Sequence, residues 1–310
     1  MNVNEDTKII HSNLENFELD SKKNKEKITN LNINDYCDNK NLKIAENINK
    51  NTINDENNKE KNLNYAIKNE SLRNFNANNK NSVELEYEKI IENNPEDLFK
   101  EITNETIEIW KKILYKKVPN LITEDSNILN SKIQNDNYKI VSNDIPRTRS
   151  KEKVLVNSFS SLLEYFISYY CEENNIKYKQ GLNEIIAPFI FLKYKLPNIP
   201  YHDIFNLLSG YINAFATNYY YEKTCFSIKN SLSLLTLLLR YHSPSLHNLF
   251  DKLMITSEMY GINWLLTTFC GKLKLHLLYH LMNKIIIDDD PTIIHYLIVA
   301  FLILKKKFIF

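Results

Sequence analysis

Arg147 is the first residue of this chain whose side chain and surroundings suggest a chemical role. It lies in the segment Val141-Ser-Asn-Asp-Ile-Pro-Arg-Thr148. Asp144 precedes Arg147 and Thr148 follows it, in a segment that we expect to be a loop before a helix. A guanidinium is permanently charged and forks onto two oxygens, which suits carboxylates and phosphates. By itself the spacing fits equally well a surface ion pair between Asp144 and Arg147, worth about 0–1 kcal/mol.

A second polar motif, Tyr178-Lys-Gln-Gly-Leu-Asn183, follows further along the chain. The glycine after Gln180 lets the backbone turn tightly or approach a partner closely. Asn183 is a suitable N-cap for a helix that begins at Glu184. Taken alone, this motif is also consistent with an ordinary helix–loop–helix joint.

The elements that position both motifs are expected to be helices. Residues 107–114 space apolar side chains at helical intervals, and Val118-Pro119 ends this helix because the residue before a proline avoids the helical region. Residues 120–150 are polar and are predicted to be mainly loop. The helices predicted after them are 154–171, 183–194 with an interruption at Pro188, 202–216, 227–241, 247–254, 260–270, 273–286 and 291–304.

Two of these helices carry further expectations. The leucines of 227–241 surround the helix almost completely, which predicts a central position in the fold. Pro291 follows Asp288-Asp-Asp290, which fits a proline in the first turn with acidic residues at the positive helix end. No segment alternates with a period of two, and four glycines are too few for a β-sandwich or a dinucleotide-binding fold. The predicted fold class is all-α, built of many short packed helices.

The composition divides the chain into two regions. Residues 1–82 are dominated by Asn, Lys, Glu and Asp, without a sustained apolar stripe. Such a segment cannot bury enough apolar surface to offset a backbone entropy of about 1–2 kcal/mol per residue. We therefore expect residues 1–82 to be a disordered, low-complexity segment and residues 83–310 to form the folded domain.

Charge and apolar runs exclude several classes of protein. Lys and Arg total 39 against 38 Asp and Glu, so no global field favours nucleic acid. The N-terminus lacks a secretory signal, and the longest apolar run, residues 293–304, falls short of the roughly 18–20 residues that span a bilayer. We expect a buried core helix there, with a weak C-terminal anchor as the alternative. We expect a cytoplasmic location, because the four dispersed cysteines are typical of a reduced, intracellular protein.

No other enzyme site is expected. His276 and His280 have metal-ligand spacing, but they lack a third ligand, and the four cysteines form no zinc clip, so no metal is predicted. The sequence contains neither a phosphate-binding loop nor a nucleophile elbow, so we expect no bound nucleotide and no serine hydrolase. The consecutive tyrosines 219–221 could edge a partner surface, but filling space in a helical corner is the preferred interpretation.

Together, the two motifs resemble the paired signatures of TBC domains, the GTPase-activating domains for Rab-type small GTPases. Both occur in the family's order, separated by one predicted helix. Trp110-Lys-Lys-Ile-Leu-Tyr-Lys-Lys-Val-Pro119 is similar to the family's opening helix. Tyr241-His-Ser-Pro-Ser-Leu246 and Tyr260-Gly-Ile-Asn-Trp264 look like its C-terminal lobe, so the likeness runs from about residue 100 to 310. It implies an all-α domain of two helical subdomains.

The resemblance also implies a function. Arg147 would be an arginine finger and Gln180 a glutamine finger, both supplied in trans to a Rab in its GTP-bound state. Asp144 and Thr148 would support the arginine loop, and Tyr178, Gly181 and Asn183 would support the glutamine loop. GTP and Mg²⁺ would belong to the partner, so no cofactor is expected here. The chain would be an activator in vesicle trafficking, peripheral on endomembranes through the Rab, rather than an enzyme with a reaction of its own. The alternative is a non-catalytic scaffold that binds a GTPase or tether.

The chain departs from the family pattern at positions that look structural. Thr106 occupies a position that is usually an arginine, Arg149-Ser150 replaces a common aromatic-Pro pair, and Tyr279-His280 replaces a Trp-Asp pair. Further helices would be expected beyond Phe310, which predicts either a truncated chain or a shortened family member. A third reading, an unrelated helical protein, predicts that Arg147 and Gln180 lie far apart.

Overall fold

The structure, a computed structural model, describes residues 84–132, 135–222 and 224–309. The predicted disordered segment, residues 1–82, lies outside them. The chain separates into Met1–Lys89 and Ile90–Phe310, and all elements named below belong to the second unit. Every regular element that the structure describes is a helix, so the all-α prediction is confirmed.

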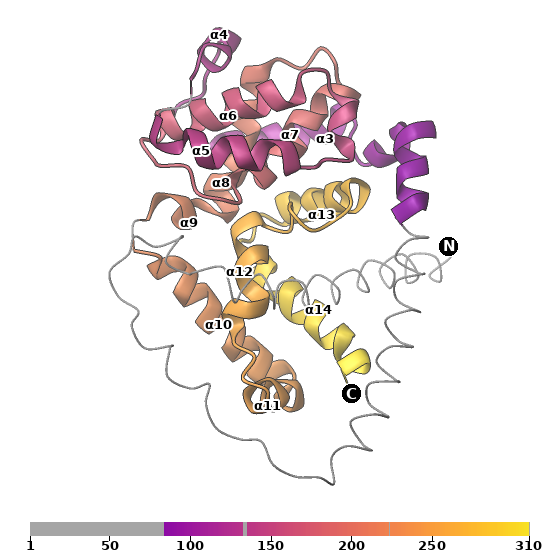
Figure 1. The fold of residues 1–310 in the computed structure, drawn as a ribbon, viewed down its shortest axis with the longest axis vertical. Helices are drawn as coiled ribbons and strands as arrows, with labels where there is room; N and C mark the ends of the chain where they lie inside the picture. Colours follow the sequence, from indigo (N-terminus) through magenta and orange to yellow (C-terminus); the bar gives the residue numbers. More distant parts are fainter. Residues whose placement is uncertain (1–83, 133–134, 223, 310) are drawn as a thin grey trace. The chain divides into compact units, whose positions relative to one another are not determined.

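One group of helices forms the N-terminal lobe (Figure 1). Here α3 packs against α8 and α13, α7 packs between α6 and α8, and α4 contacts both α6 and α8. The bounds of these helices are Asn104–Leu114 for α3, Asp125–Leu129 for α4, Phe159–Glu173 for α6, Leu182–Lys195 for α7, Tyr201–Phe215 for α8 and Leu275–Asp288 for α13. The one-turn helix η3, Pro95–Phe99, also packs against α13.

A second group of helices forms the C-terminal lobe, which is centred on α10 (Figure 1). Helix α10 contacts α9, α11, α12 and α14, while α12 also contacts α7 and so joins the two lobes. The bounds are Thr217–Tyr221 for α9, Phe226–His242 for α10, Pro244–Lys252 for α11, Ser257–Thr267 for α12 and Ile293–Ile309 for α14. The prediction of two helical subdomains is confirmed.

Trp110 occupies the centre of the N-terminal lobe. Its ring is fully buried on α3, and Nε1 donates to Asn283 Oδ1 on α13 at 3.1 Å. Tyr279 is also fully buried and donates its hydroxyl to the main-chain oxygen of Pro188 at 2.7 Å. The Trp110 indole and the Tyr279 phenol, both hydrogen-bonded, therefore fasten α13 to the lobe.

Pro188 lies inside α7, and the helix continues through it, so the predicted interruption of this helix is wrong.

Several predicted boundaries are wrong for local reasons. The segment 120–150 contains α4 and α5 (Asn135–Asp144), although it was expected to be mainly loop. Helix α6 begins at Phe159 because Ser158 adopts a positive φ of 58°, which breaks the helix predicted from residue 154. Helix α14 begins at Ile293, so Pro291 is not in its first turn. On α10, Leu237 is exposed, so the helix is central in its contacts but is not buried all round.

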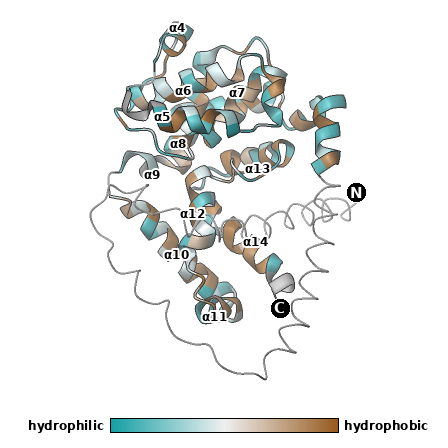
Figure 2. Ribbon diagram, viewed as in Figure 1, coloured by the Kyte–Doolittle hydropathy of each residue, from teal (hydrophilic) through white to brown (hydrophobic). Residues whose placement is uncertain are grey.

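The apolar run of 293–304 becomes α14, whose ribbon is coloured hydrophobic along most of its length (Figure 2). Ile294, Ile298, Val299 and Leu302 are buried, and the helix packs against α10 and α12. The core-helix prediction is therefore confirmed for these residues. Within the described residues, no helix has the length and hydropathy needed to cross a membrane.

Gly210 sets the closest approach between α3 and α8, and we predict that Gly210→Ala destabilises the fold. An added Cβ would lie 2.7 Å from Leu114 Cβ and would collide with the Leu114 main-chain oxygen. Because backbone cannot move aside cheaply, urea unfolding should show a net loss of about 1–3 kcal/mol. Gly261→Ala is the control: its Cβ would meet only the flexible ends of Leu235 and Leu232, so a smaller loss is expected. Equal effects of the two substitutions would contradict this account of the α3–α8 contact.

Candidate functional site

The arginine motif lies at the end of a helix rather than in the expected loop. Asp144 is the last residue of α5, and Arg147 closes a single 3₁₀ turn, η5, which spans Ile145–Arg147. The turn is compact because the Thr148 N–H donates to the Asp144 main-chain oxygen at 3.0 Å. The Asp144 side chain is fully buried, whereas 59% of the Arg147 side chain is exposed.

The glutamine motif forms the start of α7. Gly181 adopts a φ of 106°, a conformation that side-chain-bearing residues rarely adopt. A Cβ at Gly181 would also lie 3.3 Å from Tyr220 Oη and 3.4 Å from Thr267 Cγ2, so the loop passes close to α9 and α12. Asn183 is not the N-cap that was predicted, because α7 begins at Leu182 with Gly181 before it. Gln180 is exposed, directly beside this turn.

A closed ring of polar contacts, most of them hydrogen bonds, joins the two motifs. The Tyr178 hydroxyl donates to Asp144 Oδ2 at 2.7 Å and lies 2.9 Å from Asn183 Oδ1. Asn183 Nδ2 donates to Thr148 Oγ1 at 2.7 Å, and Thr148 Oγ1 donates to the Asp144 main-chain oxygen at 2.7 Å. Asn183 Oδ1 also accepts the Gly181 N–H at 3.1 Å. Two segments that are distant in sequence therefore form one structural unit, which we call the motif ring: Asp144, Thr148, Tyr178, Gly181 and Asn183.

The motif ring fixes where the two exposed side chains begin. Arg147 donates from Nη2 to Asp144 Oδ1, which orients the guanidinium while leaving its other N–H groups for further acceptors. Burial, together with the Asp144 carboxylate, raises the pKa of Tyr178 above its ordinary value, so this hydroxyl remains a donor at neutral pH. The arrangement presents a cation and an amide from adjoining loops, whose supporting side chains are buried and hydrogen-bonded.

Lys179 and helix α9 hold the glutamine loop from its other side. Lys179 Nζ donates to the main-chain oxygens of Tyr219 at 3.0 Å and Glu222 at 2.5 Å, at the carboxyl end of α9. A cation at a helix C-terminus is favourable because the terminal carbonyls carry partial negative charge. Gln180 thus lies between Lys179, anchored on α9, and Gly181, packed against Tyr220. Lys179 was not predicted as a site residue, because its position within the motif gave no signal of its partners.

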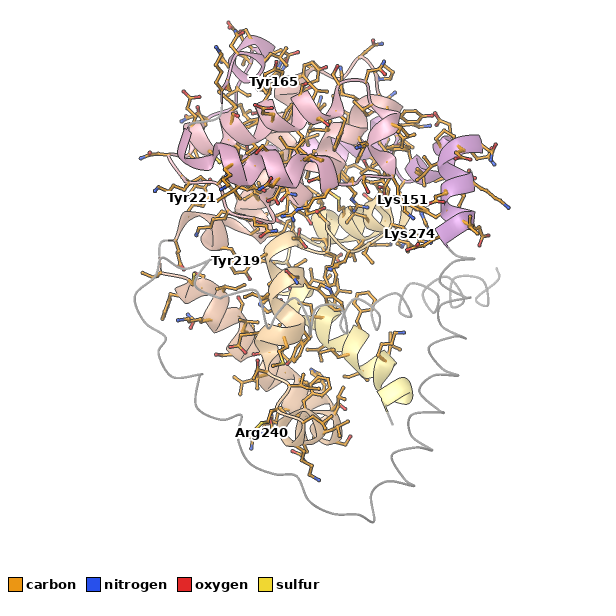
Figure 3. The ribbon with its side chains drawn as sticks, in the orientation of Figure 1. Lys151, Tyr165, Tyr219, Tyr221, Arg240 and Lys274 are labelled. Carbon is orange, nitrogen blue, oxygen red and sulfur yellow. The ribbon has the colours of Figure 1, made fainter. Side chains whose placement is uncertain are left out.

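The consecutive tyrosines connect α9 to three other elements. The Tyr219 hydroxyl forms a hydrogen bond with Ser231 Oγ on α10 at 2.9 Å. The Tyr221 hydroxyl donates to Asn174 Oδ1, just after α6, at 2.6 Å; Figure 3 labels both tyrosines. The Tyr220 hydroxyl donates to the Leu266 main-chain oxygen on α12 at 2.7 Å. The preferred interpretation, a packed helical corner, agrees with these bonds. They make α9 the joint between the lobes beside the glutamine loop.

Arg149 is a second functional candidate that the motif reading missed. Its guanidinium donates from Nη1 to Glu152 Oε1 at 3.1 Å and to the Leu273 main-chain oxygen at 2.8 Å, and from Nη2 to the Cys270 main-chain oxygen. Its side chain is 8% exposed and that of Glu152 is 6% exposed. The available signal was its departure from the family pattern, which marks a position with an unusual partner.

The other departures and the metal candidates lie outside the motif ring. Thr106 donates its hydroxyl to the Glu101 main-chain oxygen at 3.0 Å, near the start of α3. His280 Nδ1 lies 3.1 Å from Glu101 Oε1. Burial lowers the pKa of His276 to about 4. Among the residues that the structure describes, no group of three or more His, Cys, Asp or Glu could hold a metal ion.

We predict that Tyr178→Phe weakens the motif ring without unfolding the domain. The substitution keeps the packing of the aromatic side chain but removes the donor to the buried Asp144 carboxylate. The free energy of unfolding should therefore fall by about 1.5–3 kcal/mol in urea titrations. Tyr165→Phe is the control, since Tyr165 on α6, labelled in Figure 3, has no hydrogen-bond partner among the described residues. An unchanged stability of Tyr178→Phe would contradict the importance of the Tyr178–Asp144 bond.

Comparison with known proteins gives a consistent family. The model of the Rab-GTPase-TBC domain matches residues 106–310. The TBC domain-containing protein kinase-like protein of Homo sapiens is 23% identical over 149 residues, which cover 47% of this chain and 16% of that protein. The GTPase-activating protein GYP5 of Eremothecium gossypii is 23% identical over 170 residues, or 55% of this chain and 20% of that protein. The match therefore spans a fifth or less of these relatives' length.

Among solved structures, the crystal structure of the Ypt/Rab-GAP domain of Gyp1p aligns over 65% of this chain and 67% of that one. The TM-score is 0.44, at 13% sequence identity.

Proposed function

Because this chain belongs to the Rab-GTPase-TBC domain family, we propose that it accelerates GTP hydrolysis by a Rab-family small GTPase in its GTP-bound state. The observation that carries the proposal is the motif ring: exposed Arg147 directly precedes its member Thr148, and exposed Gln180 directly precedes its member Gly181. A pair of side chains so placed can act together on one bound phosphate. The alternative of an unrelated helical protein predicted two distant residues, and the hydrogen bonds between their motifs oppose it.

Arg147 acts on the charge that develops during hydrolysis. Phosphoryl transfer spreads negative charge over the phosphate oxygens, and an arginine from a partner stabilises that charge. The Arg147 guanidinium keeps N–H groups beyond the one bonded to Asp144, so it can hold its own loop and reach the phosphate at once. Asp144 restricts the rotation of Arg147, which lowers the entropy cost of placing the cation.

Gln180 acts on the attacking water. Its amide offers both a donor and an acceptor, so it can orient a water molecule toward the phosphorus. Gly181 and Lys179 hold the backbone on either side of Gln180, and a fixed backbone limits how far the amide can stray. GTP and Mg²⁺ are held by the GTPase, so this chain contributes two side chains rather than a nucleotide site.

The biological role that follows is control of the GTP-bound lifetime of a Rab. The Rab supplies the attachment to a cytoplasmic membrane surface. By accelerating GTP hydrolysis, this chain ends the active state of the Rab, and its role therefore lies in vesicle trafficking.

The experiment is single-turnover GTP hydrolysis by a panel of purified Rab proteins, each preloaded with GTP. Wild-type full chain should accelerate hydrolysis by at least one Rab, whereas Arg147→Ala and Gln180→Ala should not. Binding of each protein to the same Rab panel is measured alongside. Normal acceleration by both variants would overturn the two-finger mechanism. Binding without acceleration by the wild type would assign the chain to the non-catalytic scaffolds.

A further inference from the structure

Beyond the two fingers, the segment that follows Arg147 is itself anchored. Thr148 is fully buried within the motif ring, and Arg149 is the next residue, with its side chain nearly buried as well. Arg149 has a φ of 46°, in the left-handed region that non-glycine residues rarely occupy. Such a conformation persists only where the surroundings hold it. The chain thus turns inward immediately after the exposed Arg147.

Three acceptors from two segments hold the Arg149 guanidinium. Glu152 Oε1 at 3.1 Å belongs to the same stretch, in the 3₁₀ helix η6 (Glu152–Leu155). The main-chain oxygens of Cys270 and Leu273 belong to the loop between α12 and α13. Figure 3 labels Lys151, two residues after Arg149, and Lys274, the residue after Leu273. Arg149 therefore fastens the arginine loop to the segment that leaves the C-terminal lobe.

The same loop also contacts the residue that directly follows the glutamine motif. A Cβ at Gly271 would lie 3.2 Å from Glu184 Cγ, so Glu184 in the first turn of α7 packs directly against it. Burial raises the pKa of Glu184, while the positive charges of Arg149 and Lys272 oppose that rise. The charged groups near Arg149 thus include Glu152 from its own stretch and Glu184 from α7. The residues that directly follow the two motifs, Arg149 and Glu184, therefore both contact the 268–274 loop.

We propose that Arg149 is a positioning residue for Arg147: its guanidinium clamps the backbone after the finger to the α12–α13 loop and so sets the direction of the Arg147 side chain. Arginine is required because its planar fork reaches three acceptors in two directions, whereas a lysine ammonium is a compact point charge. This inference rests on the proposed function. It adds a residue that the two finger motifs do not include.

The test uses full-length Arg149→Met and Arg149→Lys with the Rab that responds to the wild type. At saturating concentration of this protein, each variant should lower the maximal hydrolysis rate about ten- to hundred-fold, since a displacement near 1 Å can cost about 10²-fold. The half-saturating concentration should remain close to the wild-type value. Arg240→Met is the matched control, because Arg240 is exposed on α10, away from both motifs, and it should leave the rate unchanged (Figure 3).

A second readout separates positioning from simple loss of folded protein. Affinity for the Rab with GDP and aluminium fluoride, which imitates the transferring phosphate, should fall more than affinity for the Rab with a non-hydrolysable GTP analogue. An equal fall in both affinities, or an unchanged maximal rate in a folded variant, would overturn the proposal. If Arg149→Met does not fold, Arg149→Lys decides the question, because it keeps the charge beside Glu152.

If the wild type accelerates no Rab, the proposed function fails and hydrogen exchange decides the clamp independently. The amide of Thr148 donates to the Asp144 oxygen, and the amides of Glu152 and Lys153 donate to the Arg149 oxygen, each at 3.0 Å. Faster exchange confined to these amides in Arg149→Lys would support the clamp. Exchange equal to that of the wild type would overturn it.

Discussion

Arg147→Ala is expected to lower the stimulated rate of GTP hydrolysis by about 10³–10⁵-fold, the range typical of arginine fingers. That range corresponds to about 4–7 kcal/mol of activation free energy. The loss should appear in the maximal rate at saturating concentration of this protein, because the guanidinium stabilises charge that is greatest in the transition state. Single-turnover hydrolysis of GTP preloaded on the responsive Rab measures it directly.

Two controls separate this effect from a loss of structure. Most of the Arg147 side chain is exposed, and Asp144 keeps the Tyr178 hydroxyl as a partner, so the variant should remain folded in a thermal melt. Arg240→Ala removes an exposed arginine from α10 and should leave the rate unchanged. Arg147→Lys retains the charge but cannot fork onto two oxygens, so most of the loss should persist. Full recovery in Arg147→Lys would show that simple positive charge, rather than the guanidinium, is what matters.

Gln180→Ala is expected to lower the maximal stimulated rate by about 10²–10³-fold, comparable to removing one preorganised hydrogen-bonding group from an active site. The side chain is exposed beside a backbone held by Gly181 and Lys179, so its removal should leave the fold intact. The same single-turnover assay measures the loss, and urea unfolding should give a stability within about 0.5 kcal/mol of the wild type.

Lys177→Ala is the matched control for Gln180→Ala, because Lys177 is an exposed residue of the same loop, before the motif begins. It should reproduce the wild-type rate. A wild-type rate in Gln180→Ala as well would mean that the GTPase positions its own water, and the mechanism would reduce to the arginine alone. A loss equal to that of Arg147→Ala, combined with lost Rab binding, would instead assign Gln180 to the contact surface.

The helical fold could be predicted largely from sequence, because amphipathic spacing records which face of each helix is buried. On α3 the apolar positions that predicted a helix, including Ile107, Trp110 and Leu114, are the buried ones. Helix ends were harder to predict, because they depend on single residues. Ser158 at a φ of 58° delays the start of α6, and no local preference of serine indicates that conformation. Contacts with neighbouring elements decide such cases.

The polar segment 120–150 was misjudged for a related reason. Helix α5 carries few apolar residues, so its periodicity is weak, yet Val141 and Ile145 near its end are buried. Helix α10 gave the opposite error. Its leucines suggested burial on every side, but only the face with Ile228, Leu232, Leu235 and Leu239 is buried. The spacing of apolar residues shows which faces of a helix could be buried. The neighbouring elements determine which of those faces are buried in the fold.

The sequence by itself predicted the helical class and the order of the two motifs, and it indicated Arg147 and Gln180 as the candidate finger residues. These properties are local: they depend on residue types and on spacing within a few turns. Only the tertiary structure decided that Asp144, Thr148, Tyr178 and Asn183 form one ring, because those bonds join residues more than thirty positions apart. The same holds for Arg149, whose partners lie more than a hundred positions away at Cys270 and Leu273. A buried arginine and a solvated one look alike in sequence, and only the acceptors brought near by folding distinguish them.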